Sequence, residues 1–118
     1  MHFLITIYLL FAPIPVTITV YNATPEQTNG CQFTTASGYK IDTANISRII
    51  AISPDLRQHF DFGDTVWVIC SDLRIHGQYV VRDLTSSRLT KTVDVLQCEK
   101  NGIIGKWNGY IAKNLYIY

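Results

Sequence analysis

Two aspartates, Asp83 and Asp94, are the residues of this chain whose positions best suit chemistry. Asp83 follows an apolar run at 79–81, and Asp94 lies inside another, between Val93 and Val95. An unpaired carboxylate is costly to bury, so its presence in an apolar segment needs an explanation. Because side chains alternate between the two faces of a strand, Val93 and Val95 can face a core while Asp94 faces outward, into solvent or a groove.

The two carboxylates could meet at one groove, since each ends or interrupts a strand and the strands are close in sequence. A carboxyl group beside apolar walls has a raised pKa and can act as a general acid. Cleavage of a glycosidic bond needs such an acid to protonate the leaving oxygen. From the residues alone, the alternative that both aspartates are simple surface residues stays open.

Other residue types give no comparable pattern. His59 and His76 fall in expected turns, without partners at metal-ligand spacing, so no metal site is predicted. Ser37 lacks the preceding glycine of a nucleophile elbow, and no glycine-rich phosphate loop is present, so neither a serine nucleophile nor a phosphate-binding loop is expected. Trp67 is expected to pack in the core, whereas Trp107 could stack on a sugar.

The elements that position these residues are short strands. Apolar or alternating runs rich in β-branched residues predict strands at 16–21, 48–53, 65–70, 78–82, 92–97 and 114–118. A single helical turn is expected over 54–60, with Pro54 at its start. Strands at this spacing, without a long helical pattern, are typical of a small barrel or sandwich. Closure into a barrel would also remove exposed strand edges.

Composition sets the wider limits. The chain has 118 residues, 47% of them hydrophobic and 16% charged, which indicates one folded domain. Ten Lys and Arg against nine Asp and Glu give a net charge of +1, so a nucleic-acid partner is not expected. The three cysteines form no C-x-x-C pair, and buried free thiols are the simplest expectation.

The N-terminus carries an uncharged apolar run at 3–12. It is too short to cross a bilayer as a helix, which takes about 20 residues, so no stable membrane span is expected. It fits the apolar region of a secretory signal peptide, with a buried first strand as the alternative. The sequence therefore predicts a signal peptide at 1–15 and one domain at 16–118, acting as a secreted, periplasmic or cell-envelope protein.

Taken in chain order, six segments resemble a known family. They are VTITVYNA at 16–23, TASG at 35–38, RIIAISPDL at 48–56, FGDTVWV at 62–68, GQYVVRD at 77–83 and TVDVL at 92–96. The chain resembles, over about residues 16–97, the three-aspartate (3D) domain, which also occurs at the catalytic end of membrane-bound lytic transglycosylase A. The eleven-position separation of Asp83 and Asp94 is the most specific element. The resemblance implies an all-β fold, a small six-stranded double-psi β-barrel distantly related to rare lipoprotein A.

The resemblance also implies a function, the cleavage of peptidoglycan between N-acetylmuramic acid and N-acetylglucosamine by a lytic transglycosylase. Asp94 would be the acid and base, and Asp83 would raise the pKa of Asp94 or hold its geometry. No metal or cofactor would be needed, and the partner would be peptidoglycan glycan strands. The residues carried over as substrate-binding are Tyr21, Thr35, Ser37, Gly38 and Ser53.

The chain departs from the family pattern at two places. Ser53 stands in Ala51-Ile52-Ser53-Pro54, where the family has an aspartate. The segment 84–91 contains no glycine, where the family has a glycine-rich loop. These departures bear on activity more than on fold. The alternative function is therefore a non-catalytic barrel that binds glycan or protein, in a phage virion or a bacterial envelope complex.

Overall fold

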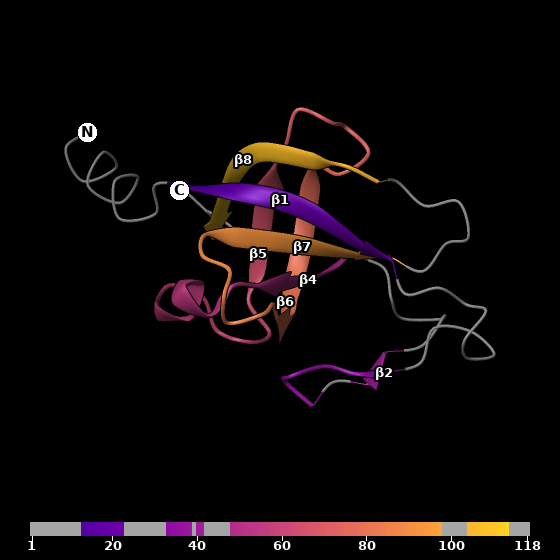
Figure 1. The fold of residues 1–118 in the computed structure, drawn as a ribbon, viewed down its shortest axis with the longest axis vertical. Coiled ribbons are helices and arrows are strands. Elements are labelled where there is room, and N and C mark those ends of the chain that lie inside the picture. Colours follow the sequence, from indigo (N-terminus) through magenta and orange to yellow (C-terminus); the bar gives the residue numbers. More distant parts are fainter. Residues whose placement is uncertain (1–12, 23–32, 39, 42–47, 98–103, 114–118) are drawn as a thin grey trace, which may run out of the picture.

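The computed structural model describes residues 13–22, 33–38, 40–41, 48–97 and 104–113. Six strands form a closed barrel in the order β1-β7-β4-β6-β5-β8, and β8 pairs back onto β1 (Figure 1). Their bounds are β1 Ile14–Asn22, β4 Ile49–Ile52, β5 Thr65–Ile69, β6 Gly77–Leu84, β7 Thr92–Gln97 and β8 Lys106–Lys113. The predicted all-β class is confirmed, and of the two architectures expected from strand spacing the chain adopts the barrel.

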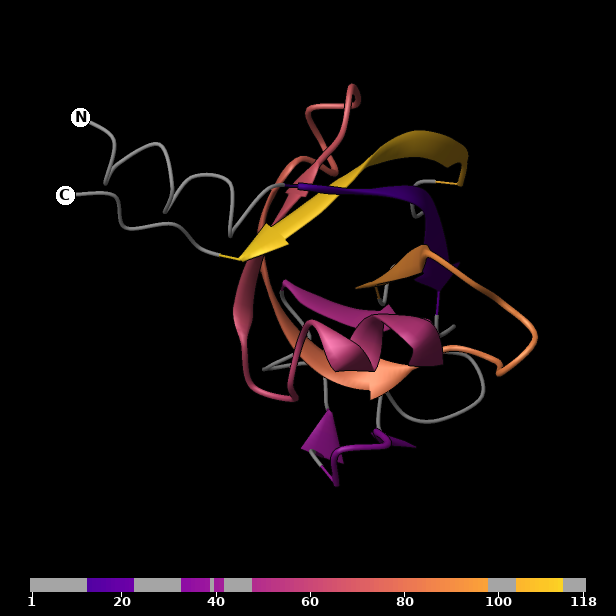
Figure 2. The same ribbon diagram turned by 90° about the vertical axis from the view of Figure 1, so that its left-hand side faces the viewer.

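The barrel contains both parallel and antiparallel pairs of neighbouring strands. β1 runs parallel to β7, and β4 runs parallel to β6. The remaining neighbours, including β7 with β4 and β8 with β1, are antiparallel. A small hairpin of β2 (Phe33–Thr34) and β3 (Lys40–Ile41) lies outside the barrel, below it in Figure 2. Among the described residues the helical segment is a 3-10 turn, η2 (Pro54–Gln58), as Pro54 led us to expect.

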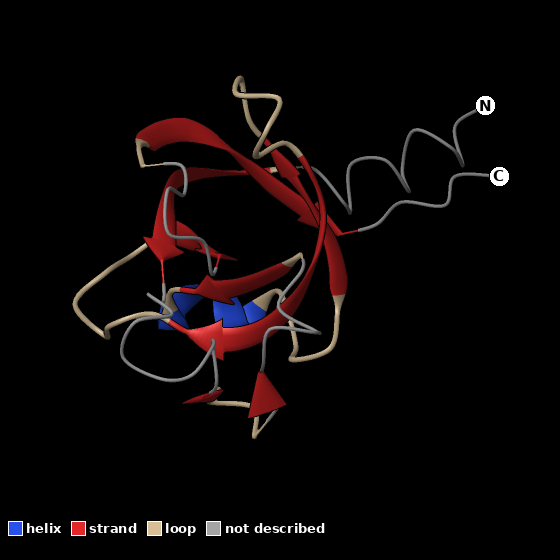
Figure 3. Cartoon of the chain, turned by 90° about the vertical axis from the view of Figure 1, so that its right-hand side faces the viewer, coloured by secondary structure: helices blue, strands red, loops and turns tan. Residues whose placement is uncertain are grey.

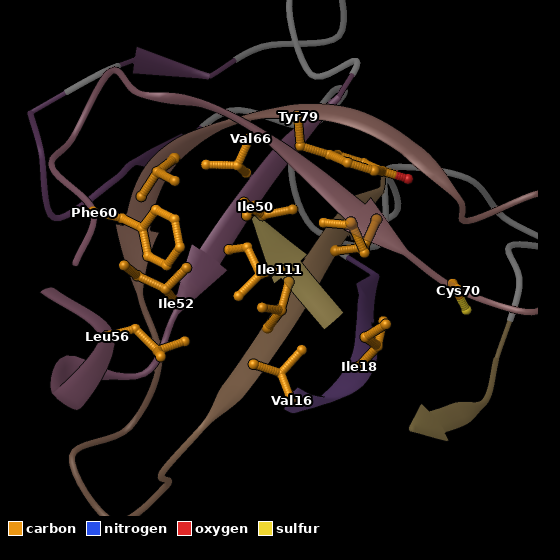
Figure 4. Close-up of a cluster of buried hydrophobic side chains, with 14 of the residues drawn as sticks. Val16, Ile18, Ile50, Ile52, Leu56, Phe60, Val66, Cys70, Tyr79 and Ile111 are labelled. Carbon is orange, nitrogen blue, oxygen red and sulfur yellow. The ribbon is translucent and has the colours of Figure 1, made fainter. Parts of the chain in front are cut away.

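The barrel is filled by β-branched side chains. The strands form a ring in Figure 3, and Figure 4 shows the buried side chains that occupy it. Burial alternates along β5, where Val66 and Val68 point inward and are fully buried. Val93 of β7 is also fully buried. Each such side chain contributes about 1.5–3 kcal/mol when fully buried. Leu56 of η2 and the nearby Phe60 belong to the same core.

One barrel strand was missed by sequence analysis. β8 spans Lys106–Lys113, whereas the strand expected at 114–118 lies outside the described residues. Gly109, in the middle of β8, weakens the sequence signal for this strand, because glycine is unfavourable inside strands. The barrel requires glycine there: a Cβ on Gly109 would lie 2.2 Å from the carbonyl oxygen of Ile69 on β5. The glycine therefore marks a close approach of two strands, not a loop.

Four other expectations concern the chain ends and single residues. β1 begins at Ile14. The signal-peptide prediction over 1–15 therefore includes Ile14 and Pro15, which pair with β8. Residues 1–12 lie outside the described part of the chain. In the described part of the chain, no helix has the length and apolarity to cross a membrane. Cys70 is a buried free thiol as expected, and the other two cysteines lie outside the described residues. Trp67 was expected in the core, but it is half-buried and its ring lies 5.9 Å from that of His76.

Candidate functional site

Asp83 and Asp94 lie on opposite sides of one small residue, Ala51. β4 runs between β6 and β7, as Figure 1 shows, and Ala51 pairs with Asp83 on one side and with Asp94 on the other. Adjacent strands are ~4.8 Å apart, so the backbones of the two aspartates are separated by about 10 Å. Because Ala51 carries only a methyl group, the space between the two carboxylates is not filled by a side chain from β4.

A β-bulge brings Asp83 to this face. Val81 is fully buried, and simple alternation along β6 would turn Asp83 inward as well. Ile50 pairs with Val81, but the next residue of β4, Ala51, already pairs with Asp83. Arg82 is therefore an extra residue in β6, and an extra residue reverses the facing of the residues after it. The bulge places Asp83 on the outer face, beside Ala51.

Asp94 reaches the same outer face by ordinary alternation, because its neighbours Val93 and Val95 are buried. The sequence-based orientation of Asp94 is thus what the strand adopts. Thr19 of β1 pairs directly with Asp94, and its hydroxyl donates a hydrogen bond of 2.9 Å to Oδ1 of the aspartate. This bond fixes the carboxyl group against the barrel wall.

The environment of Asp94 favours its protonated form. Burial is the largest cause and raises its pKa above the ordinary value, and the negative charge of Asp83 raises it further. The hydrogen bond from Thr19 acts in the opposite direction without cancelling the other two effects. The carboxyl group of Asp94 consequently keeps its proton to higher pH than an exposed aspartate does, which is the property a general acid needs.

Asp83 is held by backbone amides. Its Oδ1 accepts hydrogen bonds from the N–H of Ala36 at 2.8 Å and from that of Leu84 at 2.9 Å. The N–H of Ser37 also donates to the carbonyl oxygen of Arg82 at 3.3 Å. Asp83 thereby ties the turn between β2 and β3 to the end of β6. It serves as an anchor as well as a charge that acts on Asp94.

The turn itself is the TASG segment at 35–38. The N–H of Gly38 donates to the carbonyl of Thr35 at 2.9 Å, and Gly38 has a φ of 82°, a backbone region that favours glycine. The hydroxyl oxygens of Thr35 and Ser37 are 2.8 Å apart and share a hydrogen bond. Thr35 is buried. The hydroxyl groups of the segment are thus used at least in part to build the turn.

Both aspartates open into one cavity of about 360 Å³. It lies between β1, β4, β6, β7 and the segment that comes after β6. The described residues that line it are Tyr21, Ala51, Asp83, Leu84, Thr85, Ser86, Leu89, Asp94 and Leu96. Tyr21 is 51% exposed at its rim. An exposed aromatic ring beside carboxyl and hydroxyl groups suits a ligand with both apolar and polar faces, such as a sugar.

The structure brings together Tyr21, Asp83 and Asp94 from the predicted set, while Thr35, Ser37, Gly38 and Ser53 stand outside the cavity lining. Ser53 is fully buried. Its hydroxyl oxygen accepts a hydrogen bond of 2.9 Å from the N–H of Thr92, and its hydroxyl also bonds to the carboxylate of Asp55. Asp55 in turn accepts the N–H of Lys91 at 3.0 Å. Ser53 therefore helps to fasten the end of the segment 84–91, whose residues form one wall of the cavity.

Two contributors to the site were missed by sequence analysis. Thr19 could have been found, because it shares with Tyr21 the outward face of an alternating strand, two positions from the rim of the cavity. Ala51 gives a weaker signal: a small residue in an otherwise large apolar strand marks a place where something must fit. Across the described residues, no group of three or more His, Cys, Asp or Glu could hold a metal ion.

Comparison with known proteins adds no relative. No family model matches the chain, and no curated protein matches it significantly. The resemblance to the three-aspartate domain is an interpretation of the six sequence segments.

Proposed function

We propose that the chain is a peptidoglycan-acting lytic transglycosylase on a double-psi β-barrel, with Asp94 as general acid and base. The observation that carries this proposal is the position of Asp94. Its carboxyl group has a raised pKa and opens, beside a second carboxylate, into a cavity with an exposed aromatic rim. A site that cleaves a glycosidic bond needs a protonated acid in a groove that can hold a sugar.

The proposed reaction needs one proton and no water. The Asp94 carboxyl donates its proton to the glycosidic oxygen, and the bond from that oxygen to C1 of N-acetylmuramic acid breaks. The C6 hydroxyl of the same sugar attacks C1 and gives its proton to the Asp94 carboxylate. A 1,6-anhydro sugar forms, the leaving N-acetylglucosamine keeps a free hydroxyl group, and Asp94 is protonated again.

The neighbours of Asp94 have distinct roles in this scheme. The Thr19 hydroxyl occupies Oδ1, so the transferable proton is expected on Oδ2. Asp83 supplies negative charge, which raises the pKa of Asp94 and favours a developing positive charge at C1 of the sugar. Ala51 leaves the space in which the sugar would lie.

The strand arrangement supports the finer assignment of the fold. A double-psi barrel has six strands with parallel neighbours in each half, and this barrel has the parallel pairs β1 with β7 and β4 with β6, joined by antiparallel β7 and β4. A secreted or envelope location accords with the apolar run at 3–12 and with an extracellular polymer as substrate.

A non-catalytic barrel that binds glycan or protein is the second candidate. Two observations favour it. Ser53, in place of the third family aspartate, is buried and structural. Leu84, Leu89 and Leu96 make much of the cavity wall apolar, which suits the binding of a ligand and supplies no group for proton transfer.

Digestion of purified peptidoglycan tests the proposal. Wild type should release 1,6-anhydro-muropeptides, and Asp94→Asn should release at least about a hundredfold less, the usual contribution of an acid-base group. Asp61→Asn, which removes an exposed carboxylate elsewhere, is the matched control and should match wild type. Equal release by wild type and Asp94→Asn would refute the catalytic role. Sedimentation with peptidoglycan and no released fragment would establish the binding barrel instead.

A further inference from the structure

The outer face of β1 leads from the candidate site to a second hollow. Tyr21 lines the first cavity, and Thr19 bonds to Asp94 within the site. On the same face of the strand, Thr17 and Pro15 line another cavity, of about 370 Å³. With a rise of ~3.3 Å per residue, Tyr21 and Pro15 lie about 20 Å apart. A ligand that touches both cavities must be an extended one.

β8 supplies the other wall of this second hollow. Asn108 pairs with Thr17 and Tyr110 pairs with Pro15, so the four residues form two adjacent cross-strand pairs. Asn108 and Tyr110 are exposed, Tyr110 to 46%. A tyrosine ring next to amide and hydroxyl groups offers a stacking surface together with hydrogen-bond donors and acceptors, which is the combination that a sugar ring accepts.

Thr90 and Lys91 also line this hollow. They end the segment 84–91, which also lines the first cavity through Leu89. One segment therefore borders both cavities. Lys91 is exposed and brings a positive charge, which would attract a carboxylate attached to a sugar.

We infer that the hollow between β1 and β8 is a distal subsite for the same amino-sugar strand that the candidate site would cleave. The inference rests on the proposed function for the identity of the ligand. Two sites on one rigid barrel wall, joined by the outer face of β1, bind one polymer more tightly than either site binds a fragment. Tyr110 would stack on a sugar ring, and Lys91 would face the carboxylates that peptidoglycan carries and chitin lacks.

Binding to the non-cleaving Asp94→Asn protein tests this subsite. Isothermal titration with chitin oligosaccharides of increasing length should show a gain in affinity once the ligand reaches the second hollow. Adding Tyr110→Ala should remove that gain, about tenfold, while affinity for the disaccharide stays unchanged. Tyr110→Phe, which keeps the ring, should retain it. Lys91→Gln should weaken binding of soluble peptidoglycan strands and leave chitin binding unchanged.

The outcomes separate the subsite from the proposed catalysis. If Tyr110→Ala binds long and short oligomers as its parent does, the subsite is refuted, whatever the cleavage assay shows. If it weakens both equally, Tyr110 is not distal and the inference also fails. If the length dependence appears but wild type releases no anhydro product, the subsite stands and the catalytic proposal falls. Equal thermal unfolding midpoints of the variants establish that Tyr110→Ala is folded.

Discussion

The hydroxyl of Thr19 donates a hydrogen bond of 2.9 Å to Oδ1 of Asp94. The two residues face each other across the parallel pair of β1 and β7. The bond stabilises the ionised form of the carboxylate, while burial and the charge of Asp83 stabilise the protonated form. The protonation state of Asp94 thus depends on opposing effects. The hydrogen bond from Thr19 lowers the pKa of Asp94, while burial and the charge of Asp83 raise it.

Thr19→Val should raise the pKa of Asp94 further, because the bond that lowers it is lost and the two causes that raise it remain. Valine keeps the β-branched shape, so the strand should be retained. A ¹³C NMR titration of the Asp94 carboxyl carbon measures the shift without any activity assay. Thr19→Ser keeps the hydroxyl and should titrate close to wild type. An unchanged titration in Thr19→Val would contradict the role given to this bond.

Asp94→Asn should make the stability of the barrel less dependent on pH. A folded-state pKa raised above the ordinary 3.8 means that the favourable contribution of Asp94 is complete below pH 3.8 and is lost as pH rises through the folded-state value. At pH 7 the wild-type carboxylate is a cost that asparagine removes. Thermal unfolding should therefore give a higher midpoint for Asp94→Asn at pH 7 and a smaller difference near pH 3. A variant less stable than wild type at pH 7 would contradict the raised pKa.

The fold class and the facing of Asp94 could be predicted from the sequence because both follow from local alternation. Strand β7 was predicted with the bounds that the structure gives, and β5 and β6 were predicted to within two residues at either end. In β5 and β6 the buried residues stand at alternate positions. In β7, Asp94 lies between the buried Val93 and Val95. For these elements local pattern and tertiary packing demand the same residues.

The rest depended on relationships between strands that are distant in sequence. The register that sets Ala51 between Asp83 and Asp94 is a three-strand property, and the bulge at Arg82 reverses the facing that alternation predicts for Asp83. The burial of Ser53 follows from its bond to Thr92, thirty-nine positions along the chain. The sequence immediately around a residue does not indicate contacts with strands that are distant along the chain.

Gly109→Ala should destabilise the barrel by at least about 1–3 kcal/mol, the usual cost of forcing an extra group into a packed interior. The added Cβ would lie 2.2 Å from the carbonyl oxygen of Ile69 and 2.5 Å from Cδ1 of Ile18, so β5 or β8 must shift. Urea unfolding measures the change. Lys106→Ala, at an exposed position of the same strand, should stay within about 0.5 kcal/mol of wild type. A stable Gly109→Ala protein would show that β8 can withdraw from β5 at little cost.

Ser53→Ala should cost about 1–3 kcal/mol, because the N–H of Thr92 is left without its buried acceptor. The pKa of Asp55 should rise as well. Burial already acts to raise it, and the hydrogen bond of Ser53 is the first of the effects that hold it below the ordinary value, followed by the backbone N–H groups of Lys91 and Asp55 and the charge of Lys91. Urea unfolding and an NMR titration of Asp55 check the two effects. Ser71→Ala, at an exposed serine, is the matched control, and equal stability of the two variants would show that Ser53 is dispensable.

Ala51→Leu tests whether the space between the aspartates is the binding site. The leucine side chain would extend into the cavity that Ala51 lines, between Asp83 and Asp94. Because Ala51 faces outward, stability should change by less than about 0.5 kcal/mol. Binding of short chitin oligosaccharides should weaken by at least about tenfold, a loss of about 1.4 kcal/mol.

Ala51→Gly separates blockage from simple loss of the methyl group. It leaves the space open and should bind like wild type, at a stability cost of about 0.5–1 kcal/mol for glycine in a strand. If Ala51→Leu binds and cleaves as wild type does, the two carboxylates face a cavity that the ligand does not enter. The catalytic role of Asp94 would then fail on geometry even if its pKa is raised, because an acid must reach the oxygen that it protonates.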